Sequence, residues 1–370
     1  MSVFLGLPQV RSGGPAPSPA PVGAGLVDRH GRRATDLRLS VIDKCNLRCT
    51  YCMPAAGLPW LPAAQLMSPA EIGRIVDIGV SRFGVAELRL TGGEPLVRAD
   101  LEEVVAVVHA GHPDLPISLT TNGIGLAGRA AALAEAGLSR INVSLDSLCA
   151  ETFKQLARRD RLADVLAGAE PAAAAGLTPV KINAVLMRGV NDHEAPDLLA
   201  WALQHGFALR FIEQMPLDAD HGWTRENMVA AAEIRAALGT RFRLYPHPDP
   251  RNGAPAQLWD VRPLPGPGQG PGAEPGPLGT VGIIASVTEP FCADCKRTRI
   301  TAEGRVRSCL FSHEEVDLLP LLRAGAADAE IAETWRAAMW AKPAAHGMDQ
   351  AGLDSADYVQ PERSMSAIGG

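Results

Sequence analysis

The stretch "DLRLSVIDKCNLRCTYCMP", Asp36 to Pro54, joins a β-rich run directly to a loop that holds three cysteines. Its first part, Leu37 to Ile42, is typical of a strand. Cys45, Cys49 and Cys52 follow at C-x3-C-x2-C spacing, so three thiolates can bind one inorganic centre from a single loop. Zinc would need a fourth ligand from elsewhere, whereas an iron–sulfur cube tolerates one iron without a protein ligand. The spacing alone leaves both interpretations open.

Strand-like runs and helical segments alternate beyond this stretch. Five further runs resemble strands: Glu87 to Leu90, Ile117 to Thr120, Ile141 to Leu145, Val180 to Leu186 and Leu209 to Met215. Helices are expected at about Ser68 to Phe83, Leu126 to Ala136 and Leu162 to Ala175, the first with a capping box between Ser68 and Glu71. The alternation predicts an α/β fold with parallel strands, either a full or partial barrel or a doubly wound sheet. In each case ligands bind at the carboxyl ends of the strands.

The second predicted strand is followed by "TGGEP", Thr91 to Pro95, at that same edge. Paired glycines let backbone groups approach a ligand closely. Gly93 could equally serve the turn alone.

The pattern changes after about Arg241. Pro263 to Gly279 is a low-complexity Pro/Gly segment that we expect to form a loop. A strand at residues 281–287 and helices at about Glu314 to Arg323 and Asp328 to Ala341 are expected beyond it.

A second cysteine group, Cys292, Cys295 and Cys309, has C-x2-C-x13-C spacing. A zinc knuckle with His313 as the fourth ligand is one interpretation. Arg297 and Arg299 follow Cys295 in alternation, so on an extended segment both guanidinium groups face one side. Two arginines beside a metal centre form an anion site that suits phosphate.

Composition limits the class of protein. The 370 residues are 46% hydrophobic and 21% charged, as in globular proteins, and the net charge of -6 argues against general nucleic-acid binding. No apolar run is long enough for a membrane span, and the first 28 residues are predicted to be a disordered extension of a cytoplasmic protein. Grouped cysteines in such a chain favour metal over disulfides, and we expect no chemical role for the isolated Cys149.

With Tyr51 before the third cysteine and the "GGEP" turn, the first cysteine loop resembles that of the radical S-adenosylmethionine (SAM) superfamily. The resemblance implies a partial (β/α)6 barrel of the TIM type. It also implies a 4Fe-4S cluster on Cys45, Cys49 and Cys52, whose open iron is chelated by SAM. An electron from the cluster then splits SAM and releases a 5'-deoxyadenosyl radical.

From about Asp36 to Gly370 the chain is similar to the GTP 3',8-cyclase family of molybdenum cofactor biosynthesis. The resemblance rests on the second cysteine group with "KRTR" and on the segments "LRLTGGEPLVR", "LTTNG", "INVSLDSL", "KINAVLMRGVN", "FIEQMPL" and "RSMSAIGG". It implies conversion of GTP to 3',8-cyclo-7,8-dihydro-GTP, the first step of that pathway. We therefore expect a radical SAM core at residues 29–250 and a C-terminal region at 251–370 that carries a second 4Fe-4S cluster.

The family resemblance also assigns roles to individual residues. It implies a SAM site at Tyr51, Gly93, Ser144 and Met215, and a second cluster on Cys292, Cys295 and Cys309 that meets the guanine. The residues implied to contact GTP are Arg38, Arg89, Thr120, Lys181, Arg297, Thr298 and Arg299. The terminal Gly369 and Gly370 are implied to reach into the active site. Arg89 and Lys181 could instead be charges that cap strands.

Two alternatives to this function differ in class. One is a radical SAM maturase with an auxiliary cluster that acts on a peptide or another nucleotide, and the other is a non-catalytic two-cluster electron carrier. The expected partners are GTP, SAM, an electron donor of the flavodoxin or ferredoxin type, and cyclic pyranopterin monophosphate synthase as the next enzyme. We expect neither nucleic acid nor membrane as a partner, and the sequence leaves a homodimer open.

Overall fold

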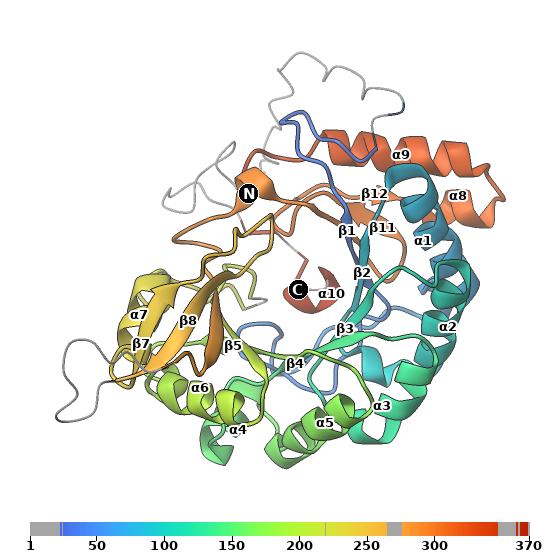
Figure 1. Cartoon of the computed structure of the whole chain (residues 1–370). Helices are drawn as coiled ribbons and strands as arrows, with labels where there is room; N and C mark the ends of the chain where they lie inside the picture. The colour runs from blue at the N-terminus through green and yellow to red at the C-terminus, as the bar shows by residue number, and fades with distance from the viewer. Residues whose placement is uncertain are drawn as a thin grey trace, which may run out of the picture.

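Six parallel strands, paired in sequence order, form the centre of the molecule (Figure 1). They are β1 (Asp36–Ser40), β2 (Glu87–Thr91), β3 (Ile117–Thr121), β4 (Arg140–Ser144), β5 (Val180–Leu186) and β6 (Ala208–Glu213). Each predicted strand is therefore present. Because the order does not reverse at any point, the crossovers all wind in one direction, as in a barrel and not as in a doubly wound sheet. The structure, a computed structural model, thus has the strand order of the predicted partial barrel.

Helices cover the outer face of the curved sheet (Figure 1). They are α1 (Pro69–Phe83), α2 (Leu101–Gly111), α3 (Leu126–Glu135), α4 (Ala150–Ala157), α5 (Leu162–Ala174), α6 (Ala195–Gln204) and α7 (Ala231–Leu238). The capping box of α1 is formed as predicted, because the Glu71 backbone N–H donates to Ser68 Oγ at 3.2 Å and the Ser68 N–H donates to the Glu71 carboxylate at 2.7 Å. Alternation along β1 buries Leu37 and Leu39 in the main core under these helices and turns Arg38 to the inside of the barrel.

The C-terminal region adds strands to both edges of the six-stranded sheet. At one edge β9 (Gly279–Ile284) pairs parallel with β6, followed by the antiparallel β8 (Gln257–Pro263) and β7 (Phe242–Pro246). At the other edge β10 (Arg297–Ile300) pairs parallel with β1, followed by β11 (Arg305–Arg307) and β12 (Val316–Asp317). The two regions therefore share one sheet.

One predicted helix begins later than expected. The segment from Glu314 was assigned to a helix, but Val316 pairs with Val306 in the sheet, and α8 covers only Leu319–Arg323. Strand pairing with a distant segment overrides the local helical pattern here. The next helix, α9 (Asp328–Trp340), matches its prediction. Short 3₁₀ turns lie at Ala63–Gln65, Pro95–Val97, Asp192–Glu194 and Cys292–Asp294.

The structure describes residues 23, 25–218, 220–264, 276–346, 360–361 and 363–368. Gly369, Gly370, most of the predicted extension and most of the predicted Pro/Gly loop lie outside the described residues. Residues 25–28, assigned to the extension, are packed, with Leu26 fully buried and Asp28 1% exposed. The helix α10 (Met365–Ile368) lies at the centre of the curved sheet (Figure 1). None of the helices in the described ranges has the length and apolar character that a membrane crossing requires.

Candidate active site

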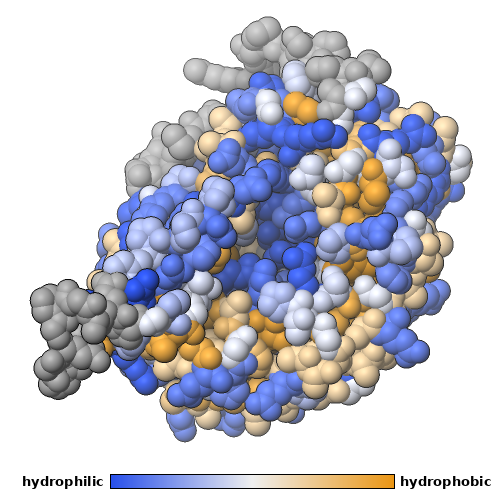
Figure 2. Space-filling model, in the orientation of Figure 1, coloured by the Kyte–Doolittle hydropathy of each residue, from blue (hydrophilic) through white to orange (hydrophobic). Residues whose placement is uncertain are grey.

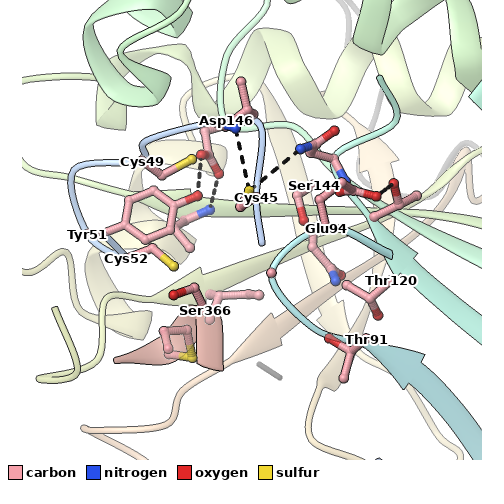
Figure 3. A pocket seen from close by; sticks show the side chains of 18 of the residues that line it. Cys45, Cys49, Tyr51, Cys52, Thr91, Glu94, Thr120, Ser144, Asp146 and Ser366 are labelled. Atoms are coloured by element: carbon pink, nitrogen blue, oxygen red, sulfur yellow. Dashed lines mark hydrogen bonds between the residues drawn. The ribbon is translucent and has the colours of Figure 1, made fainter. Parts of the chain in front are cut away.

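The first cysteine loop lies over the carboxyl ends of the central strands. Cys45, Cys49 and Cys52 line a pocket there, and Figure 3 shows them at one side of it. Backbone hydrogen bonds fix the loop: the Cys52 N–H donates to Cys49 O at 3.0 Å, and the Thr50 N–H donates to Leu156 O at 2.9 Å. The three thiols are thus presented from one ordered loop, as the sequence predicts.

The glycine turn after β2 packs against the backbone of this loop. The Gly93 N–H donates to Ile42 O, and the Glu94 N–H donates to Lys44 O, both at 2.7 Å. A β-carbon at Gly93 would lie 2.3 Å from Asp43 O and 2.4 Å from Lys44 O. Gly93 therefore allows two motifs to meet, in addition to lining the pocket.

Glu94 anchors the turn from within. Its carboxylate accepts hydrogen bonds from Thr121 Oγ1 at 2.5 Å and from the backbone N–H groups of Asn122 at 2.6 Å and Leu96 at 2.9 Å. Burial raises the pKa of Glu94 to about 7 although these donors act in the opposite direction. The sequence analysis did not single out Glu94, although its place in "GGEP" was the available signal.

Tyr51 points toward Asp146, which follows β4 and lies beside the cysteine loop (Figure 3). The Tyr51 hydroxyl donates to Asp146 Oδ2 at 2.6 Å, while the Val185 N–H donates to Asp146 Oδ1 at 2.8 Å. Burial raises the pKa of Asp146 to about 6. Asp146 was also missed, because only the fold brings it opposite the cysteine loop.

Burial dominates the electrostatics of the thiols in this loop. Burial raises the pKa of Cys45 to about 11 and that of Cys52 to about 12. A cationic iron centre would supply the charge that holds them as thiolates. Across the described ranges, no three His, Cys, Asp or Glu side chains surround a single-ion site. Each thiol of the loop can bind a different iron of one cluster, so the residues present fit a 4Fe-4S cluster that leaves one iron without a protein ligand.

The residues predicted to bind SAM gather in the same pocket. Tyr51, Gly93, Ser144 and Met215 all line it, together with Thr120, which was predicted to contact GTP. Met365 and Ser366 of α10 also line it, and Ser366 hydrogen-bonds Cys52. The pocket therefore unites the predicted SAM residues with the C-terminal segment.

A row of arginines crosses the inside of the barrel below this pocket. Arg38 of β1 is in register with Arg89 of β2 on one side and with Arg299 of β10 on the other. Side chains in register on neighbouring parallel strands project from the same face. Figure 2 shows the corresponding hollow lined by hydrophilic residues. Cys295 precedes β10 and Cys45 follows β1, so the row lies between the two cysteine groups.

Lys181 of β5 and Arg210 of β6 extend this cationic surface. The Arg210 Nη2 group donates to Asn142 Oδ1 at 2.6 Å. The aliphatic part of the Arg210 side chain packs on Gly282, where a β-carbon would lie 2.7 Å from Arg210 Cγ. The sequence analysis did not predict Arg210, since a single arginine on a strand carries no local signal. We define the cationic row as Arg38, Arg89, Lys181, Arg210 and Arg299.

Burial and mutual repulsion act on every member of the cationic row. Burial, with the charge of Arg89, lowers the pKa of Arg38 to about 9, and burial with the charge of Arg38 lowers that of Arg299 to about 9. Burial and neighbouring arginines lower the pKa of Lys181 to about 8. Within the described part of the chain, the Nε atoms of the row's four arginines have no hydrogen-bond partner. The row is therefore suited to an anion that carries several charges.

Thr298 lies on the other side of β10 from the arginines. It is fully buried, and Trp335 Nε1 of α9 donates to its Oγ1 at 3.0 Å. The side chain of Thr298, a residue predicted to contact GTP, thus packs in the core behind the strand. Arg297, two residues before Arg299, faces the pocket side and stacks 4.6 Å from the Phe291 ring centroid.

The second cysteine group has a charged environment. Arg297 Nε lies 3.4 Å and Lys342 Nζ 3.2 Å from Cys295 Sγ. Although burial opposes this effect, these two cations lower the pKa of Cys295 to about 6. His313, the alternative zinc ligand, is exposed. Both ring nitrogens of the buried His346 lack a partner within the described residues, so polar groups remain free for a bound centre.

Helix α10 packs on residues beside this second group. Ile368 is fully buried and forms an apolar cluster with Leu217, Leu310 and Phe311, against which Cys309 and Met365 also pack. The C-terminal segment therefore reaches both cysteine groups, since Ser366 contacts Cys52.

Comparisons with known proteins agree with this geometry. Residues 39–202 match the model of the radical SAM superfamily, and residues 207–348 match the model described as Molybdenum Cofactor Synthesis C. The structure of Streptococcus suis SuiB bound to S-adenosylmethionine has a TM-score of 0.55 at 13% identity, over 80% of this chain and 67% of that one. That likeness concerns the fold alone. The fold and the cysteine loop define a radical SAM protein.

Two curated relatives narrow the class. The GTP 3',8-cyclase of Paenarthrobacter nicotinovorans is 67% identical over 357 residues, which cover 96% of this chain and 100% of the relative. The GTP 3',8-cyclase of Mycolicibacterium smegmatis is 56% identical over 99% of both chains. The chain therefore belongs to the GTP 3',8-cyclase family.

Proposed function

We infer that the protein converts GTP to 3',8-cyclo-7,8-dihydro-GTP, the first step of molybdenum cofactor biosynthesis. The observation that carries this proposal is the buried cationic row between two groups of three cysteines. A triphosphate supplies the negative charge that these desolvated cations need. Family membership supplies the identity of the nucleotide.

We assign a SAM-binding cluster to Cys45, Cys49 and Cys52 and a substrate-binding cluster to Cys292, Cys295 and Cys309. When bound, the first cluster and SAM would supply reductive cleavage of SAM and removal of the ribose 3' hydrogen; C3' then joins C8 of guanine, and one electron from the donor with one proton completes the 7,8-dihydro product. Tyr51, Gly93, Ser144 and Met215 would hold SAM, since all four line the pocket beside the first group.

The chain's own residues orient the nucleotide. The cationic row would bind the triphosphate, with Arg297 beside it, and would leave the base toward Cys295, which directly precedes β10. Thr120 would contact GTP from the pocket wall, whereas Thr298 would contribute through its backbone alone. Holding C3' in one position is the main contribution of such a site to the rate.

Helix α10 would limit the access of water to the reacting carbon. Met365 and Ser366 line the pocket, and Ile368 anchors the helix in a buried apolar cluster. A closed pocket prevents a carbon radical from being quenched by solvent or stray donors. Gly369 and Gly370, which follow α10, would continue into the site as the sequence analysis predicts.

The alternative of a maturase that acts on a peptide is less well supported. A peptide offers no multiple negative charge at one point, so it would leave the desolvated arginines of the row unpaired. A non-catalytic electron carrier would not need the row at all.

Anaerobic incubation with SAM, a reductant and GTP, followed by mass spectrometry, tests the proposal. We expect 5'-deoxyadenosine together with a new compound of the same mass as GTP, and neither product from a Cys52→Ala control. Deoxyadenosine that forms equally without GTP, with no isomer of GTP, would reject the cyclase function. The proposal has three further parts. The physiological electron donor would be a flavodoxin or a ferredoxin, the next enzyme would be cyclic pyranopterin monophosphate synthase, and the assembly would be a homodimer.

A further inference from the structure

Lys342 is a buried lysine that the function described so far does not use. Its side chain is buried, with 2% of the residue exposed, and it follows directly after α9. The Nζ atom lies 3.2 Å from Cys295 Sγ, 2.8 Å from Arg297 O and 3.4 Å from Cys295 O. An ammonium group has three N–H donors, and these three acceptors account for them.

Within the described ranges, the one acceptor of Lys342 that can carry a charge is the sulfur of Cys295. A buried ammonium is strongly unfavourable unless a negative group is paired with it. Among the described residues, Lys342 Nζ donates to two carbonyl oxygens and one sulfur, and to no carboxylate. The ammonium therefore lies against a sulfur that carries negative charge when it binds iron.

The position of Lys342 is fixed from two sides. On one side, Trp335 of α9 is fully buried and donates its hydrogen bond to Thr298 of β10. On the other side, the Arg32 guanidinium donates to the carbonyl oxygens of Cys292 at 2.8 Å and Ala344 at 2.7 Å.

Arg32 is itself held in place, because its Nε donates to Asp28 Oδ2 at 2.6 Å. The cysteine loop and the segment after α9 are therefore tied together around the contact between Lys342 and Cys295.

We propose that Lys342 is a positioning residue of the second cluster, whose ammonium contacts the ligand sulfur of Cys295 and raises the reduction potential of the cluster bound there. The proposal rests on the assignment of a cluster to Cys292, Cys295 and Cys309. Hydrogen bonds to ligand sulfurs and nearby charge are among the factors that set cluster potentials. Because reduction adds one negative charge to the cluster, a fixed ammonium favours the reduced form.

A redox titration of the second cluster tests this role. The full-length protein, with both clusters reconstituted, is titrated anaerobically with dithionite and mediators, and the reduced clusters are followed by electron paramagnetic resonance. A parallel sample with Cys45, Cys49 and Cys52 replaced by alanine identifies the signal of the second cluster. We expect Lys342→Met to disfavour the reduced form about tenfold, which lowers the potential by about 59 mV for a one-electron couple.

Lys296 provides a matched control. It adjoins Cys295 in the chain, but its Nζ donates to Asn252 Oδ1 at 2.9 Å and not to the sulfur. Lys296→Met should therefore titrate as the wild type does, although it also removes one positive charge. An equal shift in the Lys296 variant, or a wild-type potential in Lys342→Met, would overturn the proposal.

A second variant or measurement decides the proposal if Lys342→Met does not fold or loses the second cluster. If Lys342→Met does not fold, Lys342→Gln, which keeps a donor and loses the charge, should shift the potential in the same direction, and a wild-type value there would also overturn the proposal. Selective loss of the second cluster from Lys342→Met, with recovery in Lys342→Arg, would support the role. A wild-type chain that binds about four irons instead of about eight would refute the assigned second cluster and not Lys342 alone.

Discussion

Replacement of Gly93 by alanine should detach the glycine turn from the first cysteine loop. The added β-carbon would lie 2.3 Å from Asp43 O, 2.4 Å from Lys44 O and 2.6 Å from the Lys44 carbonyl carbon. These are backbone atoms, so no side chain can rotate away. The turn cannot slide either, since its backbone N–H groups are hydrogen-bonded to Ile42 O and Lys44 O at 2.7 Å.

The cost follows from these contacts. Overpacking by one carbon costs typically about 1–3 kcal/mol, and three contacts with an immobile backbone place this case at about 3 kcal/mol. Loss of one of the two hydrogen bonds would add about 1 kcal/mol. We therefore expect Gly93→Ala to lower the free energy of unfolding by about 3–4 kcal/mol, measured by urea titration of the apoprotein.

The same substitution should act on one metal site and not the other. Because the turn supports the first loop, Gly93→Ala should lose the first cluster after anaerobic reconstitution and keep the second, with about four irons instead of about eight. Gly128 on α3 is the control, since no atom lies within 4 Å of its β-carbon position. Gly128→Ala should keep both clusters and stabilise the chain by about 0.5–1 kcal/mol. Full iron content and wild-type stability in Gly93→Ala would refute the reasoning.

Three further predictions concern the buried polar groups. Arg210→Ala should weaken GTP binding by about 1.5–3 kcal/mol, measured by calorimetry. The control Arg241→Ala removes only an exposed ion pair and should not change GTP binding. Equal effects of the two substitutions would argue against the cationic row as the triphosphate site. Thr298→Val should lower the free energy of unfolding by about 1–3 kcal/mol without changing GTP affinity, and weaker binding by the folded protein would restore its predicted role. Burial raises the pKa of Glu94 from 4.5 to about 7, so the folded chain holds this proton to higher pH and the free energy of unfolding should fall between those two values by about 3 kcal/mol. Glu94→Gln should lose that pH dependence, and an unchanged profile would contradict the assignment.

The sequence predicts those parts of the structure that depend on local signals. The six central strands follow from alternating apolar residues, and the start of α1 follows from Ser68 and Glu71. The three cysteines of each group were identified because metal-ligand spacing is local as well. The arginines at 297 and 299 were placed on one face by the period of a strand, and the structure places them so.

Residues whose role depends on distant partners could not be predicted in this way. Arg210 becomes part of the cationic row only because β6 curves toward β1, and Lys342 reaches Cys295 only through the packing of α9. Val316 is drawn into a strand by Val306, against its local pattern. Thr298 is a different case, because the alternation that pairs Arg297 with Arg299 already turns the Thr298 side chain to the opposite face, and only the family resemblance implied that this residue contacts GTP.

The cationic row and the cysteine groups impose opposite electrostatic demands on the same interior. Four arginines and a lysine are desolvated there, and the Nε groups of the four arginines have no hydrogen-bond partner among the described residues, which lowers the stability of the chain without a ligand. The thiols of the first group are buried as well, and this burial disfavours their negatively charged form. Neither cost is offset by the other, because the row faces the barrel axis between the two groups. An anionic nucleotide bound to the row and a cationic metal centre bound to the cysteines would offset both costs. The burial pattern therefore indicates two kinds of ligand in one cavity.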